Sequence, residues 1–263
     1  MMFRIVGFIA AAAGLVFLLL PIIVVFPLAF NTSSFLSYPL AGFSLQWFET
    51  ALSGYPWVLA FKNSFVVALC AAALSVLIGG IGALGIATSP KALRAVLTAL
   101  FVSPLVVPSV VLAVGMAFVF ARMQIIGTMW SLVLAHSVIG APLAFITVAA
   151  ALKGIDPVLD QAAASLGARR WRRFWTVTLP LAVPGFITGW IFAFIVSFDE
   201  VIIALFLSSP HSMTLPIALF GGLRDKLQPT IVAVALLLTL LTAMFLVTLS
   251  LMQRFLKKYL GRA

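Results

Sequence analysis

The stretch IVGFIAAAAGLVFLLLPIIVVFPLAF, residues 5–30, runs for 26 residues without a charged side chain. An α-helix needs about 20 apolar residues to cross the roughly 30 Å of hydrocarbon in a bilayer. The stretch therefore predicts a membrane-spanning helix. Its apolar run exceeds the core of about 7 to 15 residues found in a cleavable signal peptide, so we expect it to stay in the protein as an anchor.

The rest of the sequence repeats this composition. Of 263 residues, 64% are apolar and only 8% are charged, too few charges to cover a water-soluble surface of this size. This excludes a soluble enzyme and a disordered chain. The sequence predicts an all-α, polytopic membrane protein with six transmembrane helices, at residues 5–30, 64–88, 95–121, 127–152, 181–208 and 230–252.

Lysine and arginine predict the orientation of these spans. If the N-terminus is cytoplasmic, 12 of the 16 basic residues fall in inner segments and four in outer segments, which favours both termini inside. The inner residues are Arg4, Lys91, Arg94, Lys153, Arg169, Arg170, Arg172, Arg173, Arg254, Lys257, Lys258 and Arg262. The outer residues are Lys62, Arg122, Arg224 and Lys226. Membrane insertion thus explains most of the net charge of +10, and no nucleic-acid partner is needed.

Prolines are concentrated in the third to fifth spans, at Pro104, Pro108, Pro142, Pro180 and Pro184. Each removes a backbone donor and crowds the preceding turn, so each predicts a kink or a helix start. Proline is also common in membrane helices generally. Only the concentration of prolines in these three spans favours helices that move against their neighbours.

Several motifs that would indicate enzymatic chemistry fail. Residues 80–85 fit the G-x-G-x-x-G pattern of dinucleotide sites, but they lie inside a span, which favours a packing face. No phosphate-binding G-x-x-x-x-G-K-[ST] sequence occurs, so ATP hydrolysis by that route must come from a partner. The span histidine, His136, has no second ligand at helical spacing, and the single cysteine, Cys70, permits no disulfide within the chain.

The long inner loop at residues 153–180 begins with a helix signal. Asp156 is a suitable N-cap, and Pro157 occupies the first helical position, where a missing N–H costs nothing. Gly167 predicts a stop with positive φ. Between them, apolar residues on one helix face recur at Val158, Leu159, Ala162, Ala163 and Leu166.

A second short helix is expected over residues 168–176, where arginines alternate with aromatic residues. This composition also fits a membrane-surface anchor. The small-side-chain first helix fits that role poorly and favours docking in a groove of another protein.

The loop resembles a known family. The run Gln161-Ala162-Ala163, three residues, Gly167, nine residues and Val177-Thr178-Leu179-Pro180 is similar to the E-A-A-x(3)-G-x(9)-I-x-L-P signature, or EAA motif, of membrane subunits of bacterial ABC importers. Glutamine and valine replace the usual glutamate and isoleucine. The resemblance implies that residues 156–167 form a coupling helix in a cleft of the ATPase, without a glutamate salt bridge at Gln161. The coupling residues it implies are Asp156, Gln161, Ala162, Ala163, Gly167, Leu179 and Pro180.

Shorter motifs extend the resemblance to nearly the whole chain. Asn63-Ser64, the tract at residues 197–200 and Thr214-Leu215-Pro216 are similar to the second membrane subunit of spermidine/putrescine importers. This implies a type I ABC importer permease fold in the bacterial inner membrane. It also implies a second homologous permease, two copies of a cytoplasmic ATPase that binds ATP and magnesium, and an extracytoplasmic solute-binding protein.

Asp199 and Glu200 are the acids inside the predicted spans. A charge at membrane depth costs on the order of 3 kcal/mol, so each should face water or a cation. Neighbouring helix positions point about 100° apart, so the two need not share a cavity. Either they attract an amine-bearing solute along the path, or they hydrogen-bond backbone freed at a helix break.

We therefore expect a single permease domain over residues 1–263 that translocates a small cationic, polyamine-like solute. The same machinery could instead carry another small organic solute, such as an amino-acid derivative or opine. The remaining alternative, an intramembrane enzyme using Asp199 and Glu200, lacks a nucleophile and a metal set. Residues 35–61, with Trp47, Phe48, Tyr55 and Trp57, are expected at the outer interface, where the binding protein docks or where aromatic residues simply anchor the chain.

Overall fold

The computed structural model describes residues 2–225 and 228–260. Within them the secondary structure is helical, apart from one isolated bridge between Asn31 and Phe43. The chain forms two compact units, Met1–Val58 with Ala218–Ala263, and Leu59–Ile217. The expected all-α membrane fold is confirmed, whereas the single domain over residues 1–263 stays a prediction.

The first unit contains the chain's two ends. Its elements are α1 (Met2–Val25), the 3₁₀ helix η1 (Phe26–Phe30), α2 (Gln46–Ser53), the end of α11 (Leu215–Asp225) and α12 (Pro229–Leu260). Its core joins Ala29 of η1 to Val232 and Ala233 of α12. The Trp47 indole Nε1–H donates to the Asn31 carbonyl at 2.6 Å, so this aromatic residue is fixed inside the unit, whereas Tyr55 is 75% exposed.

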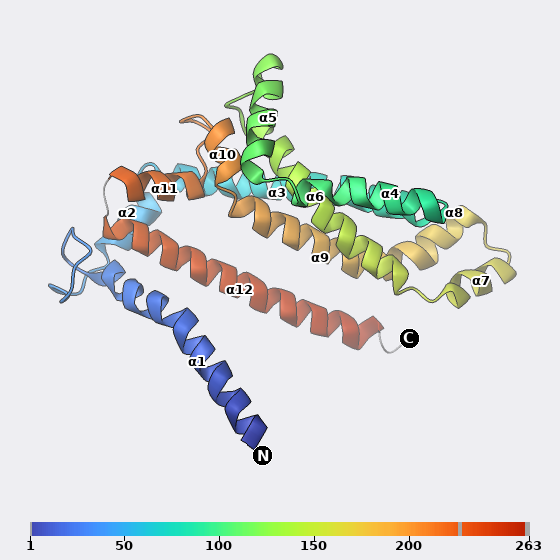
Figure 1. The fold of residues 1–263 in the computed structure, drawn as a ribbon, viewed down its shortest axis with the longest axis horizontal. Coiled ribbons are helices and arrows are strands. Elements are labelled where there is room, and N and C mark those ends of the chain that lie inside the picture. Colours follow the sequence, from blue (N-terminus) through green and yellow to red (C-terminus); the bar gives the residue numbers. More distant parts are fainter. Residues whose placement is uncertain (1, 226–227, 261–263) are drawn as a thin grey trace. The chain divides into compact units, whose positions relative to one another are not determined.

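The second unit carries most of the packed helices (Figure 1). Its elements are α3 (Trp57–Ala87), α4 (Lys91–Val102), η2 (Ser103–Leu105), α5 (Ser109–Arg122), α6 (Met129–Lys153), α7 (Pro157–Ser165), α8 (Arg170–Arg173), the π-helix η3 (Phe174–Thr178), α9 (Leu179–Phe198) and α10 (Ile202–Leu207). Helix α6 lies at its centre. In the most apolar stretch of α6, 67% of the residues are buried, against 39% in α3 and 28% in the span that ends at Phe198.

Small residues let α6 and α9 approach closely. A Cβ atom added at Gly185 would lie 2.5 Å from the Ala151 Cβ, and one at Gly189 would lie 2.6 Å from the Thr147 Oγ1. The two glycines are four residues apart on α9, so they face α6 together. This is the small-xxx-small packing by which membrane helices gain dispersion contacts without a hydrophobic driving force.

The G-x-G-x-x-G sequence of α3 behaves as a packing face at two of its three glycines. A Cβ at Gly80 would clash with the Phe186 ring, and one at Gly82 would lie 2.6 Å from the Phe101 ring. Gly85 has nothing within 4 Å. The predicted close packing is therefore confirmed for Gly80 and Gly82 but not for Gly85.

The described residues do not confirm the exact count of six spans. The described residues contain four helices long and apolar enough to cross a membrane, or five if the pair Lys91–Leu105 and Ser109–Arg122, bent by 92°, counts as one broken span. Pro108 lies in the break and Pro104 lies in the 3₁₀ helix η2 just before it, and neither can donate a backbone hydrogen bond. Pro142, in contrast, stays inside a continuous α6. Within α12, which continues to Leu260, the apolar stretch found among the described residues is Pro229–Met244.

Candidate functional site

The loop between α6 and α9 starts its first helix as the sequence predicts. The Asp156 carboxylate accepts a hydrogen bond from the Val158 N–H at 2.9 Å, and Pro157 follows as the first helical residue. This satisfies one of the N–H groups that a helix start leaves open. The start of α7 is therefore defined by neighbouring residues in the sequence and does not depend on tertiary contacts.

The same helix ends at a glycine in the left-handed region. Gly167 has φ of +81°, its N–H donates to the Ala164 carbonyl at 2.9 Å, and the Ala168 N–H donates to the Ala163 carbonyl at 3.1 Å. These two bonds make the Schellman motif that closes a helix C-terminus. The predicted positive-φ stop at Gly167 is confirmed.

The apolar face of α7 is uncovered within the described chain. Leu166 is 89% exposed, Val158 61% and Leu159 47%. Gln161 and Ala162 are also exposed, and Ala163 is half-buried. Exposed apolar residues grouped on one short helix are typical of a surface that a protein partner covers.

The second helix of the loop differs from the expected residues 168–176. Helix α8 runs through the π-helix η3 directly into α9. Leu179 and Pro180 therefore lie in the first turn of α9, inside a span that extends from Arg170 to Phe198. The Trp171, Phe174 and Trp175 rings pack on one another with centroids 5.4 to 5.7 Å apart. The aromatic residues therefore lie on a helical stretch that continues into α9 and not on a separate helix. Trp171 and Trp175 are exposed, and the membrane-surface anchor stays a prediction.

A salt bridge ties α7 to this entry. The Arg173 Nη1 donates to the Asp160 Oδ2 at 2.9 Å, with Arg173 23% and Asp160 46% exposed. The sequence analysis did not identify this pair, although an acid on one helix and a run of arginines on the next were visible. A partly exposed pair contributes about 1 kcal/mol or less, so it orients α7 more than it stabilises the fold.

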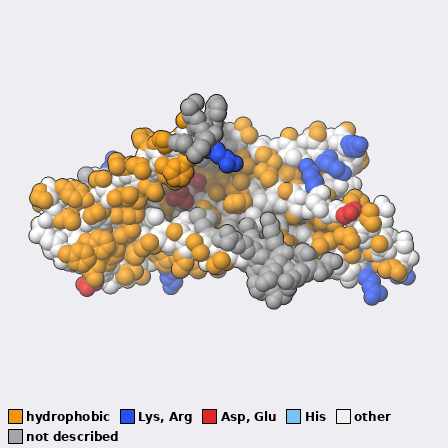
Figure 2. All heavy atoms as spheres, turned by 90° about the horizontal axis from the view of Figure 1, so that it is seen from below, with side chains coloured by type: hydrophobic (Ala, Val, Ile, Leu, Met, Phe, Trp, Pro, Cys, Tyr) orange, Lys and Arg blue, Asp and Glu red, His pale blue; other side chains and the backbone are white. Residues whose placement is uncertain are grey.

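Seven of the basic residues assigned to inner segments belong to the second unit and lie at one of its ends: Lys91, Arg94, Lys153, Arg169, Arg170, Arg172 and Arg173. Figure 1 places the start of α4, the end of α6, α7 and α8 together at that end. Figure 2 shows Lys and Arg side chains gathered there, while apolar side chains cover much of the remaining visible face. Lys226, Arg262 and the side chains of Arg254, Lys257 and Lys258 lie outside the part of the chain that the structure describes.

The fifth span ends earlier than predicted. Helix α9 ends at Phe198 and α10 begins at Ile202, so residues 181–208 are not one continuous helix. Asp199 and Glu200 lie in the break and not within the helix. The Glu200 Oε1 accepts a hydrogen bond from the Ile203 N–H at 2.9 Å, which is the backbone-bracing alternative raised for these acids.

Asp199 behaves differently from its neighbour. Its backbone N–H donates to the Ile195 carbonyl at 3.1 Å and closes α9. Its side chain is exposed, and within the described residues the only ion pair is that of Arg173 and Asp160. The structure thus separates the two acids, with Glu200 engaged locally and Asp199 available.

An aromatic ladder on α9 leads to the break. Trp190 and Phe194 are stacked with centroids 5.5 Å apart, and Phe194 and Phe198 with centroids 5.7 Å apart. From α3, Phe65 meets Phe194 edge-on at 5.8 Å and Phe61 meets Phe198 at 6.2 Å. No role was predicted for these aromatic residues from the sequence. Their spacing of four residues on α9 was the available signal.

Two of the short motifs meet beside this ladder, although about 150 residues separate them. The Asn63 side-chain amide donates to the His211 and Met213 carbonyls at 3.0 and 2.9 Å. The Ser64 hydroxyl accepts from the Leu215 N–H at 2.8 Å. These bonds fasten the chain after α10 to the start of α3, so the polar residues there build the frame around the break.

One further hydrogen bond holds α9 near its end. The fully buried His136 of α6 places its Nδ1 2.8 Å from the Ser197 Oγ. His136 therefore acts in helix packing, as predicted. Ser197 is two residues before Asp199, so the bond fixes the last turn of α9 immediately before the break.

Comparison with known proteins gives a consistent result. The family model described as "Binding-protein-dependent transport system inner membrane component" matches residues 75–260. The spermidine/putrescine transport system permease protein PotC of Haemophilus influenzae is 28% identical in sequence, and the alignment covers 90% of this chain and 92% of PotC. PhnV of Salmonella paratyphi A, a candidate 2-aminoethylphosphonate transport system permease protein, is 32% identical, over 88% of this chain and 92% of its own.

A solved structure has the same fold. A bacterial ABC transporter involved in the import of the acidic polysaccharide alginate contains a chain that superposes with a TM-score of 0.76 at 16% identity, covering 96% of this chain and 95% of that one. At this level of sequence identity, the similarity shows the fold and not the function.

Proposed function

The chain belongs to the family of binding-protein-dependent transport system inner membrane components. From this premise we propose that it forms half of the passage of an ABC importer for a small cationic solute. Members of this family are transport subunits of the inner membrane that work with binding-protein and ATPase partners. The chain is accordingly a permease subunit and not an enzyme. The solute, the partner composition and the residue roles below are proposals.

The proposed assembly pairs this chain with a second homologous permease. The pair rests on two copies of a cytoplasmic ATPase, which bind ATP and magnesium, and receives solute from an extracytoplasmic binding protein. The segment at residues 35–61 would contribute to the surface for the binding protein. In this assembly the chain supplies no cofactor site of its own.

Helix α7 is the proposed coupling element. Its start at Asp156 and its stop at Gly167 are both fixed by local hydrogen bonds, while Leu166 and Val158 are left exposed. A rigid helix with an uncovered apolar face fits a cleft in a partner. The exposed, uncharged Gln161 and the small Ala162 and Ala163 would allow docking by shape, and Leu179 and Pro180 would transmit movement into α9.

The observation that carries the cationic-solute proposal is the exposed carboxylate of Asp199 at the end of the aromatic ladder. Ammonium groups are attracted by carboxylates and by the faces of aromatic rings. Phe61 is 42% exposed and Phe65 45% exposed, so the ladder is not closed off within the described chain. A path that offers rings and then a carboxylate suits a flexible amine with charge at more than one position.

A second candidate solute is favoured by the relative named for 2-aminoethylphosphonate transport. That compound carries one ammonium group together with a phosphonate, whose negative charge Asp199 would repel. The carboxylate therefore favours a polyamine over this zwitterion. The two candidates lead to different competition results.

Uptake by the reconstituted transporter, with its own ATPase and binding protein, tests the choice. Labelled putrescine should be taken up and should be displaced by excess spermidine, and excess 2-aminoethylphosphonate should leave its uptake unchanged. Uptake of 2-aminoethylphosphonate without uptake of putrescine would replace the polyamine proposal and leave the permease role standing.

The proposed orientation, with both termini cytoplasmic, has its own test. His211 is exposed, whereas Ser209 is held by hydrogen bonds to the Gly127 carbonyl and Ser212, so a cysteine is better introduced at position 211. After Cys70 is replaced, His211→Cys should react with a membrane-impermeant thiol reagent from outside, and Ala168→Cys only from inside. The reverse pattern would overturn the orientation.

A further inference from the structure

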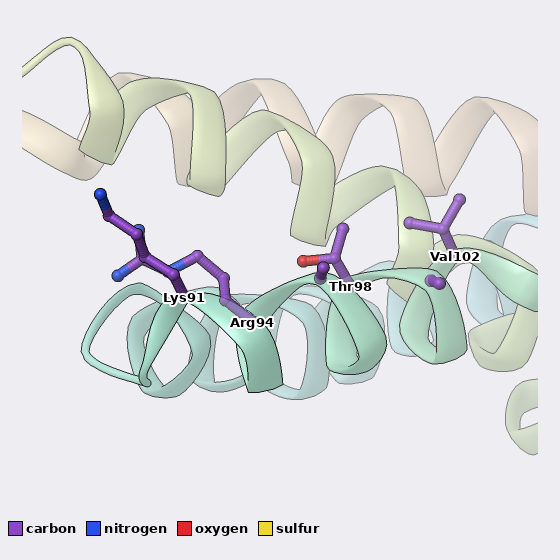
Figure 3. Close-up of a pocket in the computed structure, with 6 residues that line it drawn as sticks. Lys91, Arg94, Thr98 and Val102 are labelled. Carbon is purple, nitrogen blue, oxygen red and sulfur yellow. The ribbon is translucent and has the colours of Figure 1, made fainter.

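A groove lies along one face of α4, a helix that belongs neither to the coupling loop nor to the break. Its volume is about 480 Å³, and it is lined by Lys91, Arg94, Ala95, Thr98, Ala99 and Val102. Figure 3 shows Lys91 and Arg94 at one end and Val102 at the other. The lining residues recur every three or four positions, so they occupy a single helix face.

The polarity of the groove changes in order along the helix. Two cations come first, the Thr98 hydroxyl follows one turn after Arg94, and only the apolar Ala99 and Val102 remain beyond it. At about 1.5 Å per residue, the distance from Lys91 to Val102 is roughly 16 Å. A phospholipid has the same order over a similar length, with a charged phosphate, then ester oxygens, then an acyl chain.

The cationic end of the groove is preorganised. The Arg94 Nη2 donates to the Ala87 carbonyl at 2.7 Å and to the Ser89 carbonyl at 3.1 Å, which fixes the guanidinium against the end of α3. Neither Lys91 nor Arg94 forms an ion pair with an acid in the described part of the chain, where Arg173 pairs with Asp160. Two unpaired cations, one of them immobilised, form an attractive position for a phosphate group.

We propose that this groove binds an anionic phospholipid. The phosphate would lie between Lys91 and Arg94, and one acyl chain would lie over Ala95, Ala99 and Val102. The location of the groove is consistent with this ligand. Lys91 follows shortly after the α3 span, at the basic end of the second unit, and basic side chains beside a membrane span attract anionic lipid headgroups. The proposal requires only that the chain is a membrane protein, and it is independent of the solute.

Native mass spectrometry of the detergent-purified transporter, titrated with phosphatidylglycerol or phosphatidylcholine, tests the proposal. Wild-type complex should retain phosphatidylglycerol in preference to phosphatidylcholine. Lys91→Gln should weaken phosphatidylglycerol retention about fivefold, without changing phosphatidylcholine retention. Lys153→Gln is the matched control, since Lys153 is also exposed and ends α6 at the same end, and it should retain lipid as wild type does.

A second variant tests the acyl-chain half of the groove. Ala99 is exposed, so Ala99→Phe should fill the groove without disturbing the helix and should lower phosphatidylglycerol retention although both cations remain. The intact mass of the complex reports correct assembly. Equal retention of the two lipids, or unchanged retention in both Lys91→Gln and Ala99→Phe, would overturn the proposal. Displacement of the lipid by millimolar inorganic phosphate alone would also overturn it, since the groove would then be a simple anion site. So would a wild-type complex that retains no lipid because a second permease covers α4.

Discussion

The α7 loop and the break between α9 and α10 both interrupt the helical frame of the second unit, but different interactions build them. The loop is fixed by neighbours in sequence, with Asp156 capping Val158 and Gly167 closing the helix. The frame around the break depends on distant contacts, such as His136 with Ser197 and Ser64 with Leu215. The comparison shows that hydrogen bonds between near neighbours can fix a short exposed helix, whereas the conformation of the break depends on the helices packed around it.

The first prediction tests the proposed coupling helix α7 and has the largest expected effect. In Gly167→Val, a β-branched residue must adopt φ near +81°, a conformation that costs about 2 kcal/mol. This should displace α7 and lower both ATPase co-purification and uptake about 30-fold. Nothing lies within 4 Å of a Cβ at this position, so the cause would be backbone strain and not a clash.

Gly167→Asn is the matched control, because asparagine tolerates the left-handed region. It should retain most of the ATPase association and uptake. If the valine variant couples as well as the asparagine variant, the assignment of α7 as the docking helix is wrong.

The second prediction sharpens the distinction between the two acids of the break. Glu200→Ala removes the acceptor for the Ile203 N–H, a loss comparable to that of a helix cap, about 1 kcal/mol. Hydrogen exchange at the Ile203 amide should accelerate about fivefold. Glu200→Gln keeps an acceptor oxygen and should exchange as wild type does. Equal exchange in the alanine and glutamine variants would remove Glu200 from its bracing role.

The third prediction concerns the smallest effect, the pair between α7 and α8. Because Asp160 is 46% exposed, a double-mutant cycle of Asp160→Asn and Arg173→Gln should give a coupling energy below about 1 kcal/mol, decreasing with added salt. Thermal unfolding at two salt concentrations measures it. A coupling of several kcal/mol, unaffected by salt, would mean that the pair is buried in the assembly and holds α7 by itself.

The sequence predicted the start and the end of α7 well because these signals are local. An N-cap acid before proline and a glycine at the stop act on their own neighbours, and the structure has them where the pattern indicates. It also predicted the helical membrane class, because apolar length is a property of single segments. The extent of α8 was wrong, since the arginine-rich stretch continues into α9 through a π-helix that no propensity indicates.

The break was only partly predictable from the sequence. Asp199 and Glu200 allowed a helix break as one of two alternatives, but the residues on both sides of them are almost uniformly apolar, so hydropathy predicted a single span over residues 181–208. The aromatic ladder, too, exists only because α3 brings Phe61 and Phe65 against α9. Contacts between residues more than 60 positions apart complete these features, and the four-residue spacing within α9 indicates only its own half of the ladder.

The central claim is that coupling and solute passage are separate, with α7 acting on the ATPase and Asp199 on a cationic solute. Asp199→Asn, measured for uptake and for ATPase activity in the same proteoliposomes, tests it most directly. Loss of the carboxylate should lower putrescine uptake about 5- to 150-fold, from a lost attraction of roughly 1 to 3 kcal/mol. ATP hydrolysis stimulated by the loaded binding protein should change little. Wild-type uptake at matched expression, with translocation rate-limiting, or an equal loss of uptake and ATP hydrolysis, would contradict the claim.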